Sequence, residues 1–178
     1  VLVLEAADKG IQILALTDHN SARNLPAFAE ACEIAGIEGV FGVEVTTQEE
    51  VHLLALFRTV EEGVEFGNLM ESLLPPVANN TRLFGNQLIS DVSGSELSQL
   101  AKALYGAVPR SYEELIQNVL DRGGLSIPAH IDRHATSVLS QLGFLPDLPY
   151  SALESITIPP PIRTGLSTII QCSDAHYI

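Results

Sequence analysis

Histidine and carboxylate side chains gather at four places where an apolar run of the sequence ends. In chain order they are Asp18-His19, Glu44 with His52, His130, and Asp174-Ala-His176. Imidazole and carboxylate groups together suit Zn²⁺, Mn²⁺ and Fe²⁺. Ligands from distant parts of a chain meet when parallel strands bring their carboxyl ends to one edge of a sheet or barrel. We therefore expect a single metal centre at that edge.

Glu44 is the residue whose sequence context points most directly to a metal. It lies between Val43 and Val45 in an apolar run, and a buried carboxylate is costly unless it is paired or coordinated. The chain has only nine Lys and Arg residues to pair with it. Taken separately, Asp18 could equally be a helix cap and His52 a hydrogen-bonded core histidine. The weight of the prediction comes from all the motifs together.

Arg133 is the candidate for binding a substrate anion, because it lies close to His130 and a guanidinium can hold phosphate with two hydrogen bonds. Arg82, Arg110 and Arg163 are alternatives, and each could equally be a solvated surface cation. No glycine-rich phosphate loop precedes a helix in this sequence.

The elements that must position these residues alternate between strand and helix. Strands are expected over residues 11–17, 40–45, 51–57, 125–130, 153–158 and 167–173. Helices are expected over residues 1–9, 22–35 with a cap at Asn20 or Ser21, 61–74, 97–104, 111–122 and 135–142. This order predicts an α/β fold with a parallel sheet, open or closed into a barrel. Residues 77–95 show only turn chemistry, which suggests a substrate loop or missing chain. The junction from Ile158 to Ser167 is too short for a parallel crossover.

Length and composition predict one globular domain over residues 1–178, with 46% hydrophobic and 17% charged residues. No apolar run approaches the ~20 residues of a membrane span, and no signal peptide opens the chain. We therefore expect a cytoplasmic protein without membrane contact. The net charge of −13 argues against nucleic acid as the main partner, because phosphate backbones are held by Lys and Arg clusters. A small phosphorylated substrate remains compatible, since bound cations invert the local charge.

The four motifs resemble, in order, those of the PHP (polymerase and histidinol phosphatase) domain family. They are Thr17-Asp18-His19-Asn20, Gly42-Val-Glu44 with Val51-His52-Leu-Leu, Pro128-Ala-His130 and Ser173-Asp174-Ala-His176. The resemblance implies a distorted (β/α)7 barrel with two or three divalent metal ions, of Zn, Mn or Fe. It also implies a phosphoesterase that hydrolyses a small phosphate ester or nucleotide phosphate with metal-activated water.

The resemblance further implies a role for each residue. Glu44 would bridge two metals, one of them completed by His52 and His130, with Asp174 on the metal that shares Glu44. His19 and His176 would belong to a third metal, with Asp18 ligating or orienting beside them. The expected metal ligands are His19, Glu44, His52, His130, Asp174 and His176. The expected catalytic residues are Asp18, Glu44 and His130, with Arg133 binding substrate.

One departure from the family pattern generates a further expectation. The His-x-His motif that ends the family's first strand is absent, so we expect a strand to precede residue 1, and further residues to be missing near 92–96 and 159–166. Two other functions fit the same residues. One is amide or lactone hydrolysis by a metal-dependent enzyme of the amidohydrolase type. The other is a degenerate PHP module that binds metal or a partner without catalysis.

Overall fold

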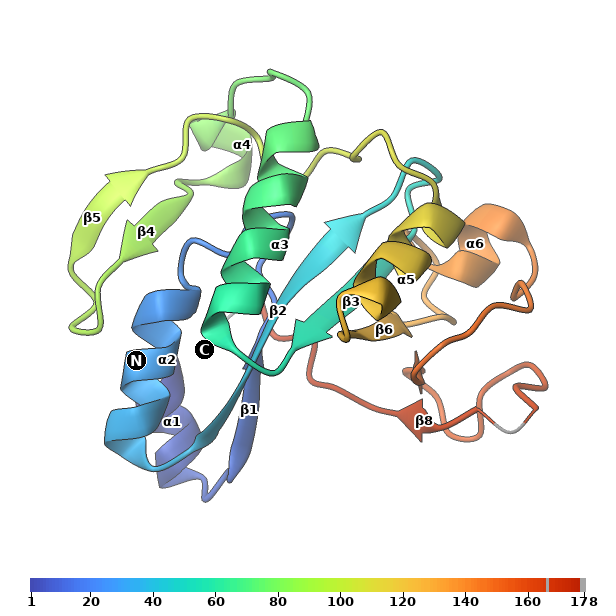
Figure 1. Ribbon diagram of the computed structural model, residues 1–178, viewed down its shortest axis with the longest axis horizontal. Coiled ribbons are helices and arrows are strands. Elements are labelled where there is room, and N and C mark those ends of the chain that lie inside the picture. Colours follow the sequence, from blue (N-terminus) through green and yellow to red (C-terminus); the bar gives the residue numbers. More distant parts are fainter. Residues whose placement is uncertain (166, 177–178) are drawn as a thin grey trace.

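The computed structural model describes residues 1–165 and 167–176, and its centre is a four-stranded mixed sheet in the order β1-β2-β3-β6 (Figure 1). β1 (Ile13–Leu16) runs parallel to β2 (Glu38–Thr46). β3 (His52–Phe57) is antiparallel to β2, and β6 (Leu125–Pro128) is antiparallel to β3. The carboxyl ends of β1, β2 and β6 therefore share one edge of the sheet with the beginning of β3.

The direction of β3 corrects the expectation of a parallel sheet. Only residues 47–51 join β2 to β3, and a parallel crossover needs about a dozen residues or more. The connection is instead a tight turn, in which the Thr47 amide donates to the Val51 carbonyl at 2.9 Å. The Val51 amide donates in return to the Thr47 hydroxyl at 3.3 Å. This short turn brings His52 back to the edge that Glu44 approaches.

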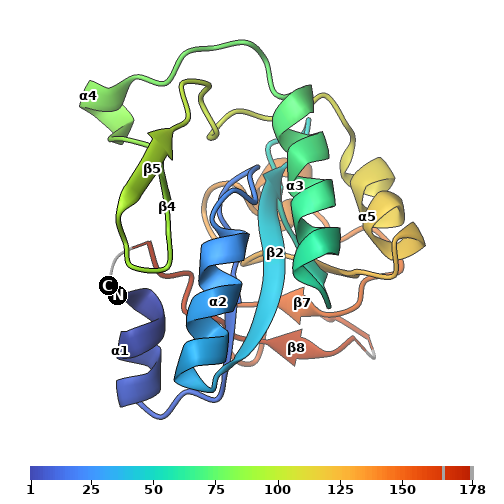
Figure 2. The same ribbon diagram turned by 60° about the vertical axis from the view of Figure 1, so that its left-hand side comes forward.

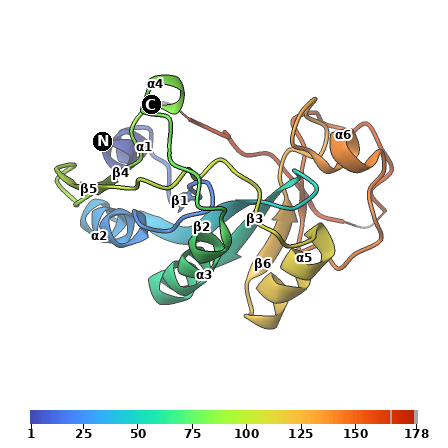
Figure 3. The ribbon, with the colours of Figure 1, turned by 90° about the horizontal axis from the view of Figure 1, so that it is seen from above.

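Three helices cover one face of the sheet and bury its apolar side chains (Figure 3). They are α2 (Leu25–Ala35), α3 (Val60–Leu73) and α5 (Tyr112–Asp121). Alternate strand residues join this core, in which Val43, Val45, Leu53, Ala55 and Phe57 are buried with Phe66 of α3. Fully burying one such large apolar side chain stabilises the fold by about 1.5–3 kcal/mol. Because strand side chains alternate, Glu44 between Val43 and Val45 points to the opposite face.

The approach of α3 to the loop before α2 depends on Gly67. A Cβ atom at Gly67 would collide with the side chain and backbone of Ala22. Ala22 lies in the loop that follows Asp18 and His19, so this close packing holds the loop against the helical layer.

The predicted helices over 61–74 and 111–122 are confirmed, and both begin with a capping box. In α5, the Glu114 amide donates to the Ser111 hydroxyl and the Ser111 amide donates to the Glu114 carboxylate, at 3.2 and 2.9 Å. α1 (Leu2–Asp8) and α6 (Val138–Leu142) match the helices expected at 1–9 and 135–142. α2 begins later than expected, because its N-cap position is Asn24 rather than Asn20 or Ser21.

Residues 77–99 differ from the prediction. They form α4 (Thr81–Phe84) and an antiparallel hairpin of β4 (Leu88–Ser90) and β5 (Glu96–Gln99), seen beside α4 in Figure 2. The helix expected over 97–104 is therefore wrong. The Leu97, Leu100 and Leu104 spacing suggested a helix, but residues 96–99 are exposed and pair with β4 instead of packing on the core.

The last strands, β7 (Leu153–Glu154) and β8 (Ile169–Ile170), form a separate two-stranded parallel sheet. Both strands are shorter than predicted, so the connection between them runs from residue 155 to residue 168. This longer connection explains why the two strands can pair in parallel although the predicted junction from Ile158 to Ser167 is too short for a crossover. Among the described residues no strand pairs with the outer edge of β1, where Ile13 is 65% exposed. A cavity of about 390 Å³ lies between β1 and residues 170–175. The fold is thus a mixed α/β domain, and the described residues do not close into the expected (β/α)7 barrel.

No helix in residues 1–165 and 167–176 is long and apolar enough to cross a membrane. The cytoplasmic location and the single-domain boundary of 1–178 stay predictions.

Candidate metal centre

The loop after β1 carries His19 to the side of Glu44. Parallel pairing continues beyond the strand, with the Glu44 amide donating to the Asp18 carbonyl at 3.1 Å and the Asn20 amide donating to the Glu44 carbonyl at 3.0 Å. Asn20 is fully buried with a φ of 49°, a conformation that asparagine tolerates better than most residues. Its amide nitrogen donates to two carbonyls at residues 104 and 106, and its oxygen accepts from the Thr46 amide. The backbone thus fixes His19 opposite Glu44.

His52 enters the centre from the beginning of β3. Its amide donates to the Thr136 carbonyl at 2.8 Å, and its carbonyl accepts from the Ala129 amide at 3.1 Å. His52 also pairs with Thr46 of β2, so it is held between β2 and the segment that follows β6.

His130 lies two residues beyond β6 and is almost fully buried, with 1% of its side chain exposed. Its φ is 30°, which is unusual for a residue other than glycine. The His130 amide donates to the Glu154 carboxylate at 2.9 Å, and Glu154 is itself buried in β7. Glu154 thereby holds the strained backbone that presents the His130 ring.

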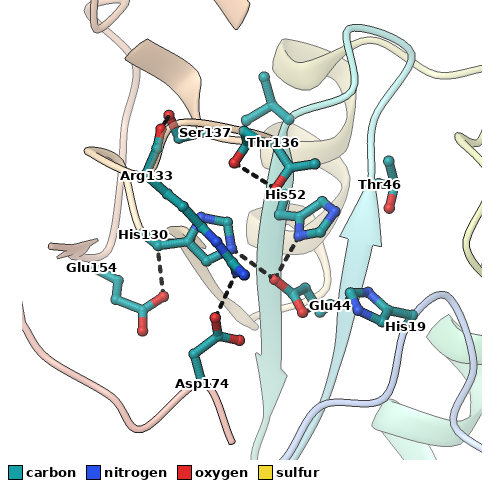
Figure 4. A network of polar contacts seen from close by, with 12 residues as sticks. His19, Glu44, Thr46, His52, His130, Arg133, Thr136, Ser137, Glu154 and Asp174 are labelled. Atoms are coloured by element: carbon teal, nitrogen blue, oxygen red, sulfur yellow. Dashed lines mark hydrogen bonds and ion pairs between the residues drawn. The ribbon is translucent and has the colours of Figure 1, made fainter. Parts of the chain in front are cut away.

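Three imidazole rings surround the Glu44 carboxylate (Figure 4). Glu44 Oε1 lies 2.9 Å from His52 Nδ1 and 3.3 Å from His130 Nε2. Glu44 Oε2 lies 3.5 Å from His19 Nδ1. Burial by itself raises the pKa of Glu44, but the contacts with His130, His52 and His19 outweigh it and hold the pKa well below its usual range. The carboxylate is therefore ionised and can act as a ligand.

Two groups of side chains have the spacing of metal ligands, and both contain Glu44. One group is His19, Glu44 and His52, and the other is Glu44, His130 and Asp174. Within each group the ligand atoms lie within 4.8 Å of one another. The resemblance to the PHP family places His52 and His130 on one metal instead, and both rings do approach Glu44 Oε1. The assignment of single ligands to single metals stays a prediction.

The buried nitrogens of the centre fit a divalent cation. His19 Nδ1 and both ring nitrogens of His130 are buried without a hydrogen-bond partner. Buried polar atoms are nearly always paired, so each such atom calls for an explanation. Burial lowers the pKa of His19 against the opposing charge of Glu44, which favours the neutral imidazole that binds metals. A cation would satisfy these nitrogens and the carboxylates together.

Asp174 and its neighbours form the open side of the centre. Arg133 Nη1 donates to Asp174 Oδ2 at 2.7 Å, so Arg133 lies beside the cluster (Figure 4). His176 Nδ1 lies 2.9 Å from the Asp174 carbonyl oxygen, and its ring centroid is 5.7 Å from that of His19. His176 belongs to neither ligand group among the described residues.

Asp18 also stands outside the two ligand groups in the part of the chain that the structure describes. Its Oδ2 atom accepts from Asn24 Nδ2 at 3.0 Å. Burial raises the pKa of Asp18, although the Asn24 hydrogen bond and the charge of His19 oppose the shift. The geometry favours an orienting rather than a ligating position.

Two supporting residues, Glu154 and Asn24, are not among the site residues predicted from the sequence. Glu154 could have been found by the reasoning applied to Glu44, since it is a carboxylate in an apolar run. The Asn24 side chain donates to the Asp18 carboxylate and to the Leu88 carbonyl of β4, and it accepts from the Ser90 amide of the same strand. Its local sequence suggested only a helix interior.

A family model for the PHP domain matches residues 1–135. The chain belongs to the PHP domain family. The match covers His19, Glu44, His52, His130 and Arg133, whereas Asp174 and His176 lie beyond it. No curated protein matches the chain.

Solved structures share the fold of this PHP domain at low sequence identity. The lesion-specific endonuclease Q of Pyrococcus furiosus matches with a TM-score of 0.54 and 18% identity over 86% of this chain. An endonuclease Q complex with a 27-mer duplex, carrying an abasic lesion at the active site, matches with a TM-score of 0.53, 16% identity and the same coverage. The chain spans 36% of each endonuclease Q chain. A protein of Bifidobacterium adolescentis, for which metal-dependent phosphoesterase activity has been suggested, matches with a TM-score of only 0.48 and 20% identity. This match covers 75% of this chain and 61% of that protein.

These structures correct one expectation from the sequence. The net charge of −13 predicts that nucleic acid is not the main partner, yet a protein with this fold binds a DNA duplex at its active site. The charge argument fails because net charge is a property of the whole surface. The field at a metal centre is set locally by the bound cations.

Proposed function

We propose that this PHP domain is a metal-dependent phosphoester hydrolase whose centre is organised by Glu44. The observation that carries the proposal is that one buried carboxylate belongs to two ligand groups at once. A carboxylate shared in this way is suited to bridging two cations, and paired cations are a recurring device for cleaving phosphate esters.

Each cation would be held by a different pair of side chains, with Glu44 shared between them. His19 and His52 would hold one cation together with Glu44, and His130 and Asp174 would hold the other together with the same carboxylate. The mixed nitrogen and oxygen donors suit Zn²⁺, Mn²⁺ or Fe²⁺. A third cation at His19 and His176 remains the expectation from the family resemblance. Bound cations of this kind would lower the pKa of a water to about 7 and withdraw charge from phosphoryl oxygens.

The surrounding protein keeps the ligands in place before anything binds. Asn20 fixes the backbone of His19, and Glu154 fixes that of His130. Such supporting contacts typically change metal affinity or activity by about 10–100-fold when they are removed. Asp18 acts in the same way, since its hydrogen bond to Asn24 orients the loop that carries His19.

Arg133 is the group that would bind the substrate phosphate. Its guanidinium lies at the open side of the centre, 2.7 Å from Asp174 Oδ2, with nearly half of its side chain exposed. A guanidinium has five N–H donors, so it can keep Asp174 while donating to a phosphate oxygen. Arg133 would thereby bind substrate and steady Asp174 together.

A phosphodiester of nucleic acid is a second candidate substrate. The observation in its favour is the shared fold with endonuclease Q, one structure of which holds duplex DNA with an abasic lesion. Because the chain spans about a third of endonuclease Q, this similarity concerns one part of that enzyme and not the whole of it.

A substrate panel tests the proposal. The purified protein is reconstituted with Mn²⁺, Zn²⁺ or Fe²⁺ and assayed on a phosphate monoester, a phosphodiester, duplex DNA with an abasic site, an amide and a lactone. The proposal predicts metal-dependent hydrolysis of a phosphate ester. Hydrolysis of the amide or lactone alone would indicate an amidohydrolase, and tight metal binding without hydrolysis of any substrate would indicate a non-catalytic module.

A further inference from the structure

A cavity of about 490 Å³ opens beside the metal centre. Asp18, His19 and His176 form the wall that it shares with a smaller cavity over Glu44 and Asp174. The two spaces therefore meet at the metal centre. The larger cavity has the volume of a small-molecule site, which is typically about 300–1,000 Å³.

Two stacked aromatic side chains, Phe84 and Tyr105, are part of the lining of this cavity. The rings of Phe84 and Tyr105 have centroids 3.9 Å apart and an interplanar angle of 30°. Phe84 is 55% exposed and Tyr105 is 41% exposed, so the pair leaves aromatic surface uncovered. Leu88, Leu100 and Leu104 add apolar surface around it. A flat aromatic group entering the cavity could extend this stack.

Two polar side chains of the cavity lining, Gln87 and Asn24, make hydrogen bonds that hold the segments around the Phe84–Tyr105 pair. Gln87 donates to the Leu100 and Lys102 carbonyls and accepts from the Leu104 amide, which fixes the residue before Tyr105. Asn24 ties the β4 hairpin to Asp18. Through these bonds the aromatic pair keeps its place relative to the loop that carries His19.

The charge of the cavity argues against a second anion as its occupant. Arg23 is the one Lys or Arg among the described lining residues, and its guanidinium is held by both oxygens of Glu71 at 2.9 and 3.0 Å. A ligand in this space therefore meets aromatic and apolar surface beside the anion-binding metal centre.

We propose that Phe84 and Tyr105 form a base-binding subsite, so that the phosphate cleaved at the metal centre is joined through a sugar to a nucleobase. The phosphate half of this inference rests on the proposed function, and the base half rests on the aromatic cavity. A nucleobase supplies the planar ring that the stack accepts, and base–aromatic stacking is tolerant of which base is present. The base can come from a free nucleotide or from a nucleic-acid strand.

Binding and hydrolysis of matched ligands test this proposal. Adenosine 5′-monophosphate and ribose 5-phosphate differ only in the base, and a short single-stranded oligonucleotide supplies bases within a strand. Calorimetry measures binding of each ligand to the wild type, Phe84→Ala, Tyr105→Ala and Tyr105→Phe, and a parallel assay measures phosphate release. Phe144→Ala is the matched control, because Phe144 is 61% exposed and lies outside the cavity lining.

The proposal predicts that the wild type prefers a base-bearing ligand over ribose 5-phosphate. Phe84→Ala and Tyr105→Ala should each weaken binding of that ligand about ten-fold, with ribose 5-phosphate unaffected. Tyr105→Phe, which keeps a ring, should behave like the wild type, as should Phe144→Ala. Preference for the mononucleotide or for the oligonucleotide identifies the source of the base.

The two proposals fail separately. Equal binding of base-bearing and base-free ligands, or equal losses for both in the alanine variants, overturns the base subsite even when hydrolysis proceeds. Preferential, Phe84-dependent binding without hydrolysis of any ester supports the subsite and overturns the proposed activity. Thermal unfolding of each variant shows whether a loss of binding comes from misfolding. If an alanine variant misfolds, two comparisons decide instead: the affinity of the wild type for adenosine 5′-monophosphate against ribose 5-phosphate, and the same comparison in Tyr105→Phe. Equal affinity for the two ligands in both proteins overturns the base subsite.

Discussion

The two sides of the metal centre are built differently. On the sheet side, the backbone of Glu44, His52 and His130 is hydrogen-bonded to neighbouring segments. At most 13% of each of these side chains is exposed. On the other side, Asp174 and His176 follow the two-residue strand β8, with 27% and 47% of their side chains exposed. Arg133 is the side chain that ties Asp174 to the rest of the molecule. The contrast indicates a rigid half that sets ligand geometry and an open half that admits substrate.

Breaking the carboxylate that both halves share should have the largest effect. Glu44→Gln removes the charge from both ligand groups, so we expect loss of both cations and a fall in kcat of at least about 1,000-fold. Metal content by elemental analysis and phosphate release check this. Glu38→Gln, an exposed position on the same strand, is the matched control and should keep metal and activity. Wild-type activity in Glu44→Gln would contradict the account.

Asp174→Asn removes the carboxylate of the open half and leaves the ligands of the rigid half unchanged. We expect loss of one of two cations and a fall in kcat of about 100-fold, because Glu44, His19 and His52 remain to hold the other cation. Elemental analysis of the purified variant measures the stoichiometry. Loss of both cations would show that the two halves are not independent.

Arg133→Ala tests the contact that steadies the open half. We expect KM for a phosphate ester to rise about ten-fold with a smaller fall in kcat, since a charge-assisted hydrogen bond contributes about 1.5–3 kcal/mol. Arg133→Lys keeps the charge without the bidentate geometry and should fall between the wild type and Arg133→Ala. An unchanged KM in steady-state kinetics would remove Arg133 from substrate binding.

His176→Ala should have the smallest effect. His176 is half-exposed, its Nδ1 lies 2.9 Å from the Asp174 carbonyl oxygen, and among the described residues it joins neither ligand group. We expect a fall in kcat/KM of only about two- to three-fold. A loss as large as that of Asp174→Asn would instead favour the third metal that the family resemblance implies.

The sequence indicated which residues meet, and less about how they meet. Glu44, His52 and His130 could be singled out because charged or polar side chains in apolar runs need a partner. The antiparallel return of β3 was missed although the turn at 47–51 is too short for a crossover. The hairpin of β4 and β5 could not be read from the pattern, since exposed residues 96–99 carry no burial signal.

The supporting residues were the least visible from the sequence. Glu154 and Asn24 act through long-range hydrogen bonds to His130 and to the β4 hairpin. The local sequence marks Glu154 only as a carboxylate in a predicted strand, and it does not distinguish Asn24 from an ordinary asparagine within the expected helix. The Phe84–Tyr105 pair is likewise a product of folding, because α4 and the loop after β5 are far apart in the chain.

A crystal structure of the protein soaked with Mn²⁺, with anomalous scattering recorded, tests the central claim most directly. The account predicts two anomalous peaks about 3.5–4 Å apart with the Glu44 carboxylate between them, the usual separation in two-metal sites. A single peak, or two peaks without Glu44 as a shared ligand, would contradict it.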